Sequence, residues 1–278
     1  MQGQRPSSLR YLAPGGPTAV YTRALDTLTA AGLPYLVGGG HALMHYTRIK
    51  RATRDLDLFL RPGHIEPAMA ALTNAGYATE RTHPHWLAKA RTGRHCVDLI
   101  FNSGNGLSEV DDVWFEKAHQ AKILGRPADL VPPEELTWTK LFIMERERYD
   151  GADVAHLLYA ASGEFDWRRL RDRVGSHWRV LLSHLILFGS IYPSEQAKVP
   201  GWLLDELMSL LQRERQGPAP QERVCQGTLL SRQQYLHDVQ AAHYRDVRAT
   251  AASSMSARDI AAWTAAGERD SHAHDDDS

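Results

Sequence analysis

The sequence predicts an α/β protein of the α+β kind, with a small mixed sheet in an N-terminal domain and an all-helical C-terminal domain. Short apolar runs alternate with helical patterns as far as residue 131, and from Pro132 onward the pattern is helical. A chain of 278 residues can bury a substantial core. We expect four parts: a flexible N-terminus (1–16), an α/β domain (17–131), a helical domain (132–250) and a largely disordered tail (251–278).

Each expected element follows from the local apolar pattern and from the glycine and proline residues that end helices and strands. Glycine stops end the first and third helices, Gly125 marks a hairpin, and the Pro- and Gly-containing run 215–224 reads as a linker or loop. In the first half we expect helices over 18–32, 41–46 and 65–77, and strands over 34–38, 54–60, 77–82, 85–91, 95–101 and around Gly125. In the second half we expect helices over 134–146, 152–162, 166–174, 178–192 and 201–215.

Composition fits a cytoplasmic protein with no membrane partner. No apolar run approaches about 18 residues, and the first twenty residues contain no hydrophobic segment of the signal-peptide kind. The net charge is −1, so no global field attracts nucleic acid, although arginines cluster locally over 48–54. Cys96 and Cys225 are far apart, which argues against a disulfide framework and favours two buried thiols.

The stretch "YLVGGGHALMHY" places three consecutive glycines between a buried strand and a helix. Glycines at such a junction let the backbone approach a ligand closely and leave helix N-terminal amides uncovered, which suits a phosphate. A tight turn without a ligand is the alternative. His41 and His45 have the spacing of a zinc pair, but Ala42 stands where the glutamate of HExxH would be.

The next strand, "RDLDLFL", carries two carboxylates on one face. Alternation sends Asp55 and Asp57 to one side and the leucines to the other. Two adjacent carboxylates repel, and Asp is a poor strand former, so this face needs a cation or water. Mg²⁺ prefers carboxylate oxygens together with substrate phosphates. A solvated sheet edge is the other interpretation.

A third carboxylate follows in "HCVDLIF", where Asp98 lies on a strand face that is otherwise occupied by Cys96 and Ile100. Burying a single acid there is costly without a partner. The alternative is a strand-end aspartate that faces solvent. No GxxxxGK[ST] or GxSxG motif occurs, which removes the phosphate-loop NTPases and the hydrolase elbow.

The sequence resembles the nucleotidyltransferase superfamily in the order of its motifs. These are a glycine pair, a helix, an RxTxDhDh segment (h, apolar) and a later hDhhF strand. The resemblance is to its small bacterial members, of the AbiEii type and the minimal nucleotidyltransferases, and it covers about residues 18–160. It implies a nucleotidyltransferase-like fold for the first domain. It implies a glycine pair within Gly38, Gly39 and Gly40, and a catalytic, metal-binding set of Asp55, Asp57 and Asp98.

The resemblance also implies a nucleotide site and a reaction. Arg51 and Thr53 match the residues that precede the acidic pair, and Lys140 would reach the triphosphate. Asp55 and Asp57 would hold two Mg²⁺ ions, with Mn²⁺ as the alternative, and Asp98 would share the second. The implied chemistry moves a nucleoside monophosphate from an NTP, ATP among them, to an acceptor hydroxyl and releases pyrophosphate.

In the segment "RYDGADVAHLL", the resemblance implies that Arg148, Asp150 and Asp153 organise the start of a helix. From the residues alone, we expect the two aspartates to cap that helix rather than to take part in chemistry.

The acceptor stays open: a tRNA or other RNA end, a small molecule such as an antibiotic, or a protein. A toxin–antitoxin role, with a cognate antitoxin as partner, is one of the functions that the resemblance leaves open. The alternative from another class is a catalytically idle module that binds a nucleotide or a partner on the same scaffold. A sugar-nucleotide glycosyltransferase is a third interpretation of the two aspartates.

Overall fold

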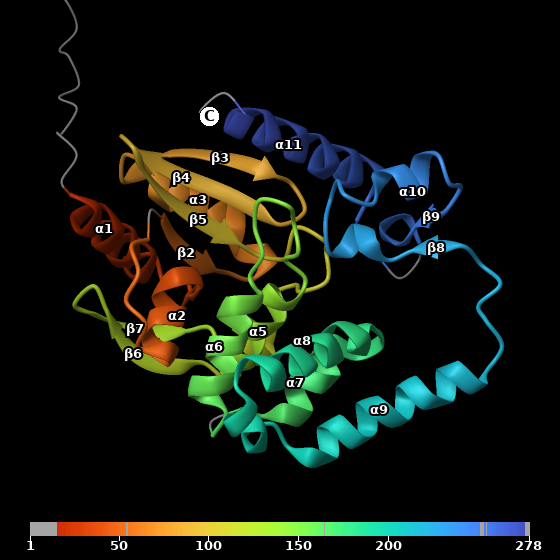
Figure 1. The fold of residues 1–278 in the computed structure, drawn as a ribbon. Helices are drawn as coiled ribbons and strands as arrows, with labels where there is room; N and C mark the ends of the chain where they lie inside the picture. Colours follow the sequence, from red (N-terminus) through yellow and green to blue (C-terminus); the bar gives the residue numbers. More distant parts are fainter. Residues whose placement is uncertain (1–15, 54, 164, 251–252, 254, 276–278) are drawn as a thin grey trace, which may run out of the picture.

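The computed structural model describes residues 16–275 except 54, 164, 251, 252 and 254, with the backbone alone for 267–275 (Figure 1). The predicted flexible N-terminus, apart from its last residue, and the last three residues of the predicted tail lie outside the described residues. A seven-stranded mixed sheet forms the centre, in the order β3-β4-β5-β2-β1-β7-β6. Its strands are β1 (Leu36–Val37), β2 (Asp55–Phe59), β3 (Ala78–His83), β4 (Leu87–Thr92), β5 (His95–Ile100), β6 (His119–Ile123) and β7 (Arg126–Leu130).

Helices alternate with these strands and then follow them, as the sequence predicted. Those of the first half are α1 (Pro17–Ala30), α2 (Gly39–Thr47), α3 (Ile65–Asn74) and α4 (Asp112–Glu116). Those of the second half are α5 (Pro133–Leu141), α6 (Gly151–Ala161), α7 (Trp167–Val174), α8 (Trp178–Ile191), α9 (Gly201–Gln216), α10 (Leu236–Gln240) and α11 (Ala257–Asp275). Within the described residues, no helix is both long and apolar enough to cross a membrane.

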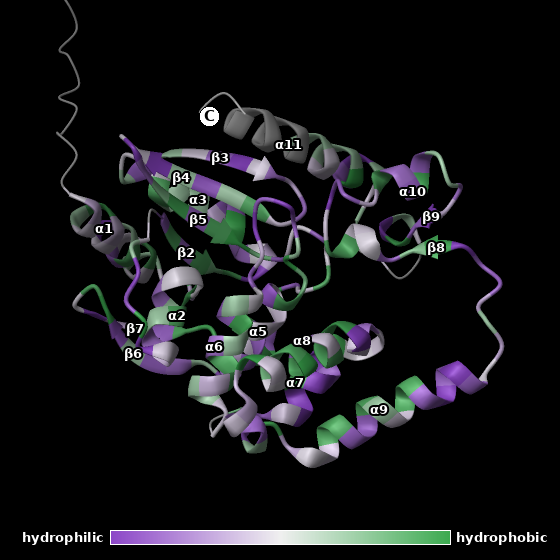
Figure 2. Ribbon diagram, in the orientation of Figure 1, coloured by the Kyte–Doolittle hydropathy of each residue, from purple (hydrophilic) through white to green (hydrophobic). Residues whose placement is uncertain are grey.

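The two faces of the central strands have different roles. On β2 and β5, Leu56 pairs with Val97 and Leu58 with Leu99, and all four side chains are fully buried. Helix α1 contacts β5, α3 contacts β3 and β4, and the two helices contact each other. Figure 2 accordingly shows β2 and β5 mostly in the hydrophobic colours. Because side chains alternate along a strand, the intervening residues point to the opposite face, where the polar groups gather.

The helices of the second half of the chain pack against the first half through α5 and α6, and α5 is buried almost along its whole length. Helices α5 and α6 both contact α2. Two consecutive acids, Glu134 and Glu135, are fully buried in the first turn of α5, where the positive end of the helix dipole favours them. Arg169 on α7 pairs with both, and Arg173 donates to Glu135 at 3.1 Å. Buried charge is therefore compensated by arginines of α7, the helix that Figure 2 shows as mostly hydrophilic.

Helix α5 ends at Leu141, although the pattern predicted a helix to residue 146. The following segment turns back on itself, with an isolated bridge between Met144 and Tyr149. The amide of Met144 donates to the carbonyl of Leu230 at 3.1 Å, so a tertiary contact replaces a further helical turn. This turn places Glu145 and Arg148 beside the cavity described below.

The C-terminal part differs from the sequence expectation in two respects. It contains a pair of two-residue parallel strands, β8 (Val224–Cys225) and β9 (Arg245–Asp246), and is thus not all-helical. In the predicted tail, residues 257–275 form α11, which contacts β3 (Figure 1). The apolar spacing of Ile260, Trp263 and Ala266 gives α11 a packing face within a polar segment. Trp263 contacts Trp86 and His83, with ring centroids 5.2 and 5.0 Å apart.

Candidate active site

Three carboxylates meet at the centre of the polar face of the sheet. Strands β2 and β5 are parallel neighbours, with Asp57 opposite Asp98 and Asp55 opposite Cys96. Residues that are paired across neighbouring strands point to the same face. One ligand oxygen from each of Asp55, Asp57 and Asp98 lies within 4.8 Å of the others. The structure therefore brings together the three acids that the sequence singled out.

Asp57 has the most perturbed environment of the three. Burial, followed by the negative charges of Asp55 and Asp98, raises its pKa to about 7, and the positive charges of Arg148 and Lys140 offset part of this rise. In the part of the chain that the structure describes, the carboxylates of Asp55 and Asp57 make no hydrogen bond or ion pair. A half-buried carboxylate that lacks a close counter-ion is costly to ionise, so the position of Asp57 favours a bound cation.

Asp98, in contrast, has a close cation. The Lys89 ammonium donates to both carboxylate oxygens at 2.9 Å, and the Cys96 thiol donates to Oδ1 at 3.1 Å. Burial, together with the negative charge of Asp98, raises the pKa of Cys96 to about 12, which keeps it a neutral donor. Cys96 and Cys225 are free thiols, and both are half-buried rather than buried as the sequence suggested.

The glycine turn brings the start of α2 against β2. Gly38 precedes the helix, and its amide donates to the Asp57 carbonyl at 3.0 Å. Gly39 has φ +50°, a conformation that L-residues rarely adopt, and it lines the cavity. A Cβ would overlap the Phe59 ring at Gly38, the Asp57 carboxylate at Gly39 and the Thr53 methyl group at Gly40. All three glycines thus permit close packing, and Gly39 permits it beside the acids.

Arg51 and Thr53 hold the segment before β2 in place. Arg51 donates to both carboxylate oxygens of Asp153 on α6, at 2.9 and 3.1 Å. The hydroxyl of Thr53 lies 3.4 Å from Nε2 of His41. The structure gives both side chains protein partners, and neither residue lines the cavity that holds the acids.

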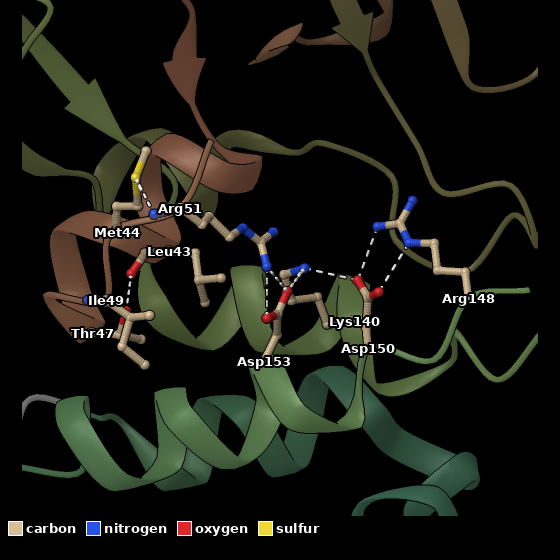
Figure 3. A network of polar contacts seen from close by, with 9 residues as sticks. All are labelled: Leu43, Met44, Thr47, Ile49, Arg51, Lys140, Arg148, Asp150 and Asp153. Atoms are coloured by element: carbon tan, nitrogen blue, oxygen red, sulfur yellow. Dashed lines mark hydrogen bonds and ion pairs between the residues drawn. The ribbon is translucent and has the colours of Figure 1, made fainter. Parts of the chain in front are cut away.

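Lys140 forms the centre of a network of charges between α5 and α6 (Figure 3). Its ammonium lies 2.8 Å from Asp150 and 2.7 Å from Asp153, and the residue is 4% exposed. Arg148 donates to both oxygens of Asp150 at 2.9 Å. Although burial alone would raise the pKa of Asp150, the hydrogen bond from Arg148 and the charge of Lys140 hold it at about 2.

This network corrects the capping expectation for the two aspartates. Asp150 occupies the position before the first residue of α6, but its side chain makes no capping hydrogen bond. Asp153 lies in the first turn, and its carboxylate binds Lys140 and Arg51. Their main partners are the three cations, which tie the segment before β2 to the helical half.

The acids open into a cavity of about 460 Å³. Lys140 and Arg148 line it near the acids together with Gly39. The C-terminal segment supplies another wall, with Thr228, Leu229, Leu230, Arg232 and Trp263. The Arg232 guanidinium lies over the Trp263 ring at 4.5 Å and pairs with Glu145 at 3.3 Å. The cavity is therefore built from parts of the chain more than 200 residues apart in sequence.

Sequence reasoning did not identify several of these residues. It missed the Lys89 partner of Asp98, the cavity-lining role of Arg148, and the aromatic wall of Trp86 and Trp263. A signal for Lys89 was present, because it lies between Ala88 and Ala90 on the strand that precedes Asp98. The position of Trp263 had no local signal.

The donor set fits a hard divalent cation. Three carboxylates supply oxygen ligands of the kind that Mg²⁺ and Mn²⁺ take, and Asp55 and Asp57 have no competing partner among the described residues. His41 and His45 join no comparable group of ligands in that part of the chain.

Comparisons with known proteins give matches to solved structures alone. No protein-family model matches the chain, and no curated protein matches it. The antibiotic-resistance factor ANT(2'')-Ia has a TM-score of 0.44 at 16% identity, over 60% of this chain and 95% of that one. The lincosamide antibiotic adenylyltransferase LnuA, lincomycin-bound, has a TM-score of 0.37 at 16% identity, over 51% and 96%.

A third similar structure is terminal uridylyl transferase 4 from Trypanosoma brucei with bound GTP. Its TM-score is 0.28 at 12% identity, over 61% of this chain and 64% of that one. Two of these three structures are, by their names, an adenylyltransferase and a uridylyl transferase.

Proposed function

We propose that the protein is a metal-dependent nucleotidyltransferase, which moves a nucleoside monophosphate from an NTP to an acceptor hydroxyl. One observation carries the proposal: carboxylates of Asp55, Asp57 and Asp98 lie within 4.8 Å of one another, in a cavity that Lys140 and Arg148 also line. Clustered acids suit a cation, and neighbouring cations suit phosphates. A triphosphate with its metal carries both kinds of charge.

Each group has a distinct part in this proposal. Asp55 and Asp57 would hold Mg²⁺ or Mn²⁺, which when bound neutralises phosphate charge and polarises the phosphoryl oxygens. Gly39 lets the N-terminal amides of α2, the positive end of the helix dipole, approach the same place. Lys140 and Arg148 add positive charge on the cavity wall, and their own aspartates fix their positions.

The proposed reaction is an in-line displacement. The acceptor oxygen forms a bond to the α-phosphorus, the bond from that phosphorus to the bridging oxygen breaks, and pyrophosphate departs. The hydroxyl proton passes to a carboxylate of the triad. Positioning and charge contribute most to such a transfer, so three acids and two cations on rigid elements suffice.

The acceptor would lie toward the wall that carries Trp86, Trp263 and Arg232. This wall offers aromatic surface and one cation, which suits a ring-containing small molecule or an exposed base at an RNA end. A hydroxyl on a protein is the third choice, and a cognate antitoxin would be a separate partner.

The test incubates the protein with Mg²⁺ and each NTP labelled at the α-phosphate, in parallel with total RNA, a small-molecule extract or a protein extract. We expect label to move into one acceptor pool, with release of pyrophosphate, and Asp55→Asn to lose transfer by at least about two orders of magnitude. Absence of transfer with all four nucleotides would favour the idle module, whereas transfer from a UDP-sugar would favour a glycosyltransferase. Asp205→Asn, far along the chain on α9, is a matched control.

A further inference from the structure

Lys89 stands at the end of a row of charged side chains that crosses three strands. On β4 it lies opposite Asp98 of β5, and Asp98 lies opposite Asp57 of β2. Residues that are paired in this way share one face of a sheet. An ammonium group and two carboxylates therefore follow one another across the polar face that carries the site.

The row is not evenly compensated. Two hydrogen bonds from Lys89 and one from the Cys96 thiol engage the carboxylate of Asp98. A carboxylate has about four lone-pair directions, so little acceptor capacity is left on Asp98. Asp55 and Asp57 keep their full acceptor capacity, since their carboxylates make no hydrogen bond or ion pair with any described residue. The positive charge of the row thus lies at one end, and the unsatisfied oxygen ligands lie at the other.

Lys89 is also well held. The side chains of Lys89 and Asp98 are 22% and 13% exposed, and the ammonium lies 2.9 Å from each carboxylate oxygen. A charge-assisted, bidentate contact with little exposure to water is stronger than a surface ion pair. A second divalent ion at Asp98 would have to displace the ammonium or remain beside it, and like charges at such distances repel strongly.

We propose that the Lys89 ammonium is the fixed counter-cation of Asp98 and takes the place of a second divalent ion, so that the metal-binding site holds one ion, at Asp55 and Asp57. This inference rests on the proposed function, because it concerns the same carboxylates. It departs from the two ions that the family resemblance implies. Lys89 acts through Asp98, and it is therefore a positioning residue.

The experiment counts metal ions on the protein without nucleotide or acceptor. Mn²⁺ is titrated into purified full-length protein, and the free ion is measured by its electron paramagnetic resonance signal. We expect one Mn²⁺ per wild-type chain. Lys89→Met keeps the length of the side chain but removes its charge, and we expect two ions in that variant, because Asp98 becomes available.

Two controls accompany this variant. Lys89→Arg retains the positive charge opposite Asp98 and should keep one ion. Lys122→Met removes an exposed lysine from β6, at the far edge of the same sheet, and should also keep one ion. Two ions in the wild-type protein, or a single ion in Lys89→Met, would overturn the assignment of Lys89.

Loss of Lys89 leaves Asp98 without its cation and could impair folding, so a double variant is included. Lys89→Met with Asp98→Asn removes both charges, and we expect it to bind one ion; two ions, or none, would contradict the proposal. Metal counting is independent of the labelled-transfer assay. Two ions with intact transfer would refute the role of Lys89 alone, whereas transfer that persists in excess EDTA would refute the metal-dependent function.

Discussion

Gly39 lies directly against the carboxylate of Asp57, and the space that a Cβ would occupy at this glycine is filled by that carboxylate. The start of α2 and the middle of β2 are therefore fitted to each other. Gly39 has a φ of +50°, which is a second reason why an L-residue is unfavourable at this position. Close packing and a demanding backbone conformation coincide at a residue that lines the cavity.

Gly39→Ala should consequently destabilise the protein by about 2 kcal/mol or more, since left-handed strain and steric overlap add. Gly125→Ala is the matched control, because Gly125 has φ +81° but open space around its Cβ position, and about 1 kcal/mol is expected from strain alone. Urea unfolding measures both values. Equal losses in the two variants would show that contact with Asp57 is unimportant.

The raised pKa of Asp57 predicts a pH dependence of stability in the metal-free protein. The folded-state pKa of about 7 exceeds the ordinary value of 3.8, so the folded protein binds the Asp57 proton more tightly than the unfolded chain does. The contribution of this group is present below about pH 4 and is lost as the pH rises toward 7. Asp57→Asn should therefore be more stable than wild type at pH 8, by on the order of 2 kcal/mol.

This difference between wild type and Asp57→Asn is measured by urea unfolding in EDTA at pH 5 and pH 8. Other groups titrate in both proteins. The relevant quantity is therefore how much the difference in unfolding free energy between wild type and Asp57→Asn changes from pH 5 to pH 8. A difference that stays constant with pH would contradict the raised pKa.

Metal binding should show the opposite pH dependence. A cation needs the ionised form of Asp57, whose pKa is about 7, so affinity for Mn²⁺ should fall as the pH decreases below 7, by up to about tenfold per pH unit. Calorimetric titration at pH 8 and pH 6 checks this. Asp57→Asn should bind weakly at both values with a much smaller pH slope, and an unchanged wild-type affinity would remove Asp57 from the ligands.

The network around Lys140 predicts that replacing this lysine lowers the stability of the protein strongly, although lysine is usually an exposed residue. Lys140→Met leaves two carboxylates, those of Asp150 and Asp153, without their buried cation, and should cost about 3–5 kcal/mol of unfolding free energy. Arg51→Met removes a cation from the same Asp153, but the Arg51 side chain is 43% exposed, so about 1 kcal/mol or less is expected.

Unfolding free energies of the two variants decide this comparison. Adding Asp153→Asn to Lys140→Met should recover part of the loss, because one of the uncompensated charges is removed. Similar small losses in both single variants would mean that the lysine is free to serve nucleotide alone.

The sequence was sufficient to predict the acids because alternation along a strand is a local property. Placing Asp55 and Asp57 on one face requires only their spacing, whereas the position of Asp98 beside Asp57 depends on the pairing of β2 with β5, and the family resemblance supplied that expectation. The Lys89 contact could not be predicted in this way, since it depends on which strands are neighbours and in which register. Register between β4 and β5 is set by the buried Ala88 and Ala90 opposite Leu99 and Val97, which a single strand does not reveal.

The helix ends and the C-terminal part were harder to predict from the sequence for a similar reason. The pattern after Leu141 still favours a helix, yet the Met144 amide bonds to Leu230, nearly ninety residues later. Likewise, the polar composition of 251–278 predicted disorder, although Ile260, Trp263 and Ala266 give α11 an apolar face that has β3 and its neighbours to pack on. Long-range contacts, rather than local helix propensity, determine the structure of these segments.

The two ends of the cavity lie far apart in the order of synthesis. A nascent chain that has released β2 and β5 already possesses its three carboxylates, whereas Trp263 and Arg232, which close another side, leave the ribosome much later. A product of premature termination before residue 227 would thus keep the acidic cluster and lose the wall formed by residues 228–263. Such a fragment would expose Trp86 and the acids to solvent together.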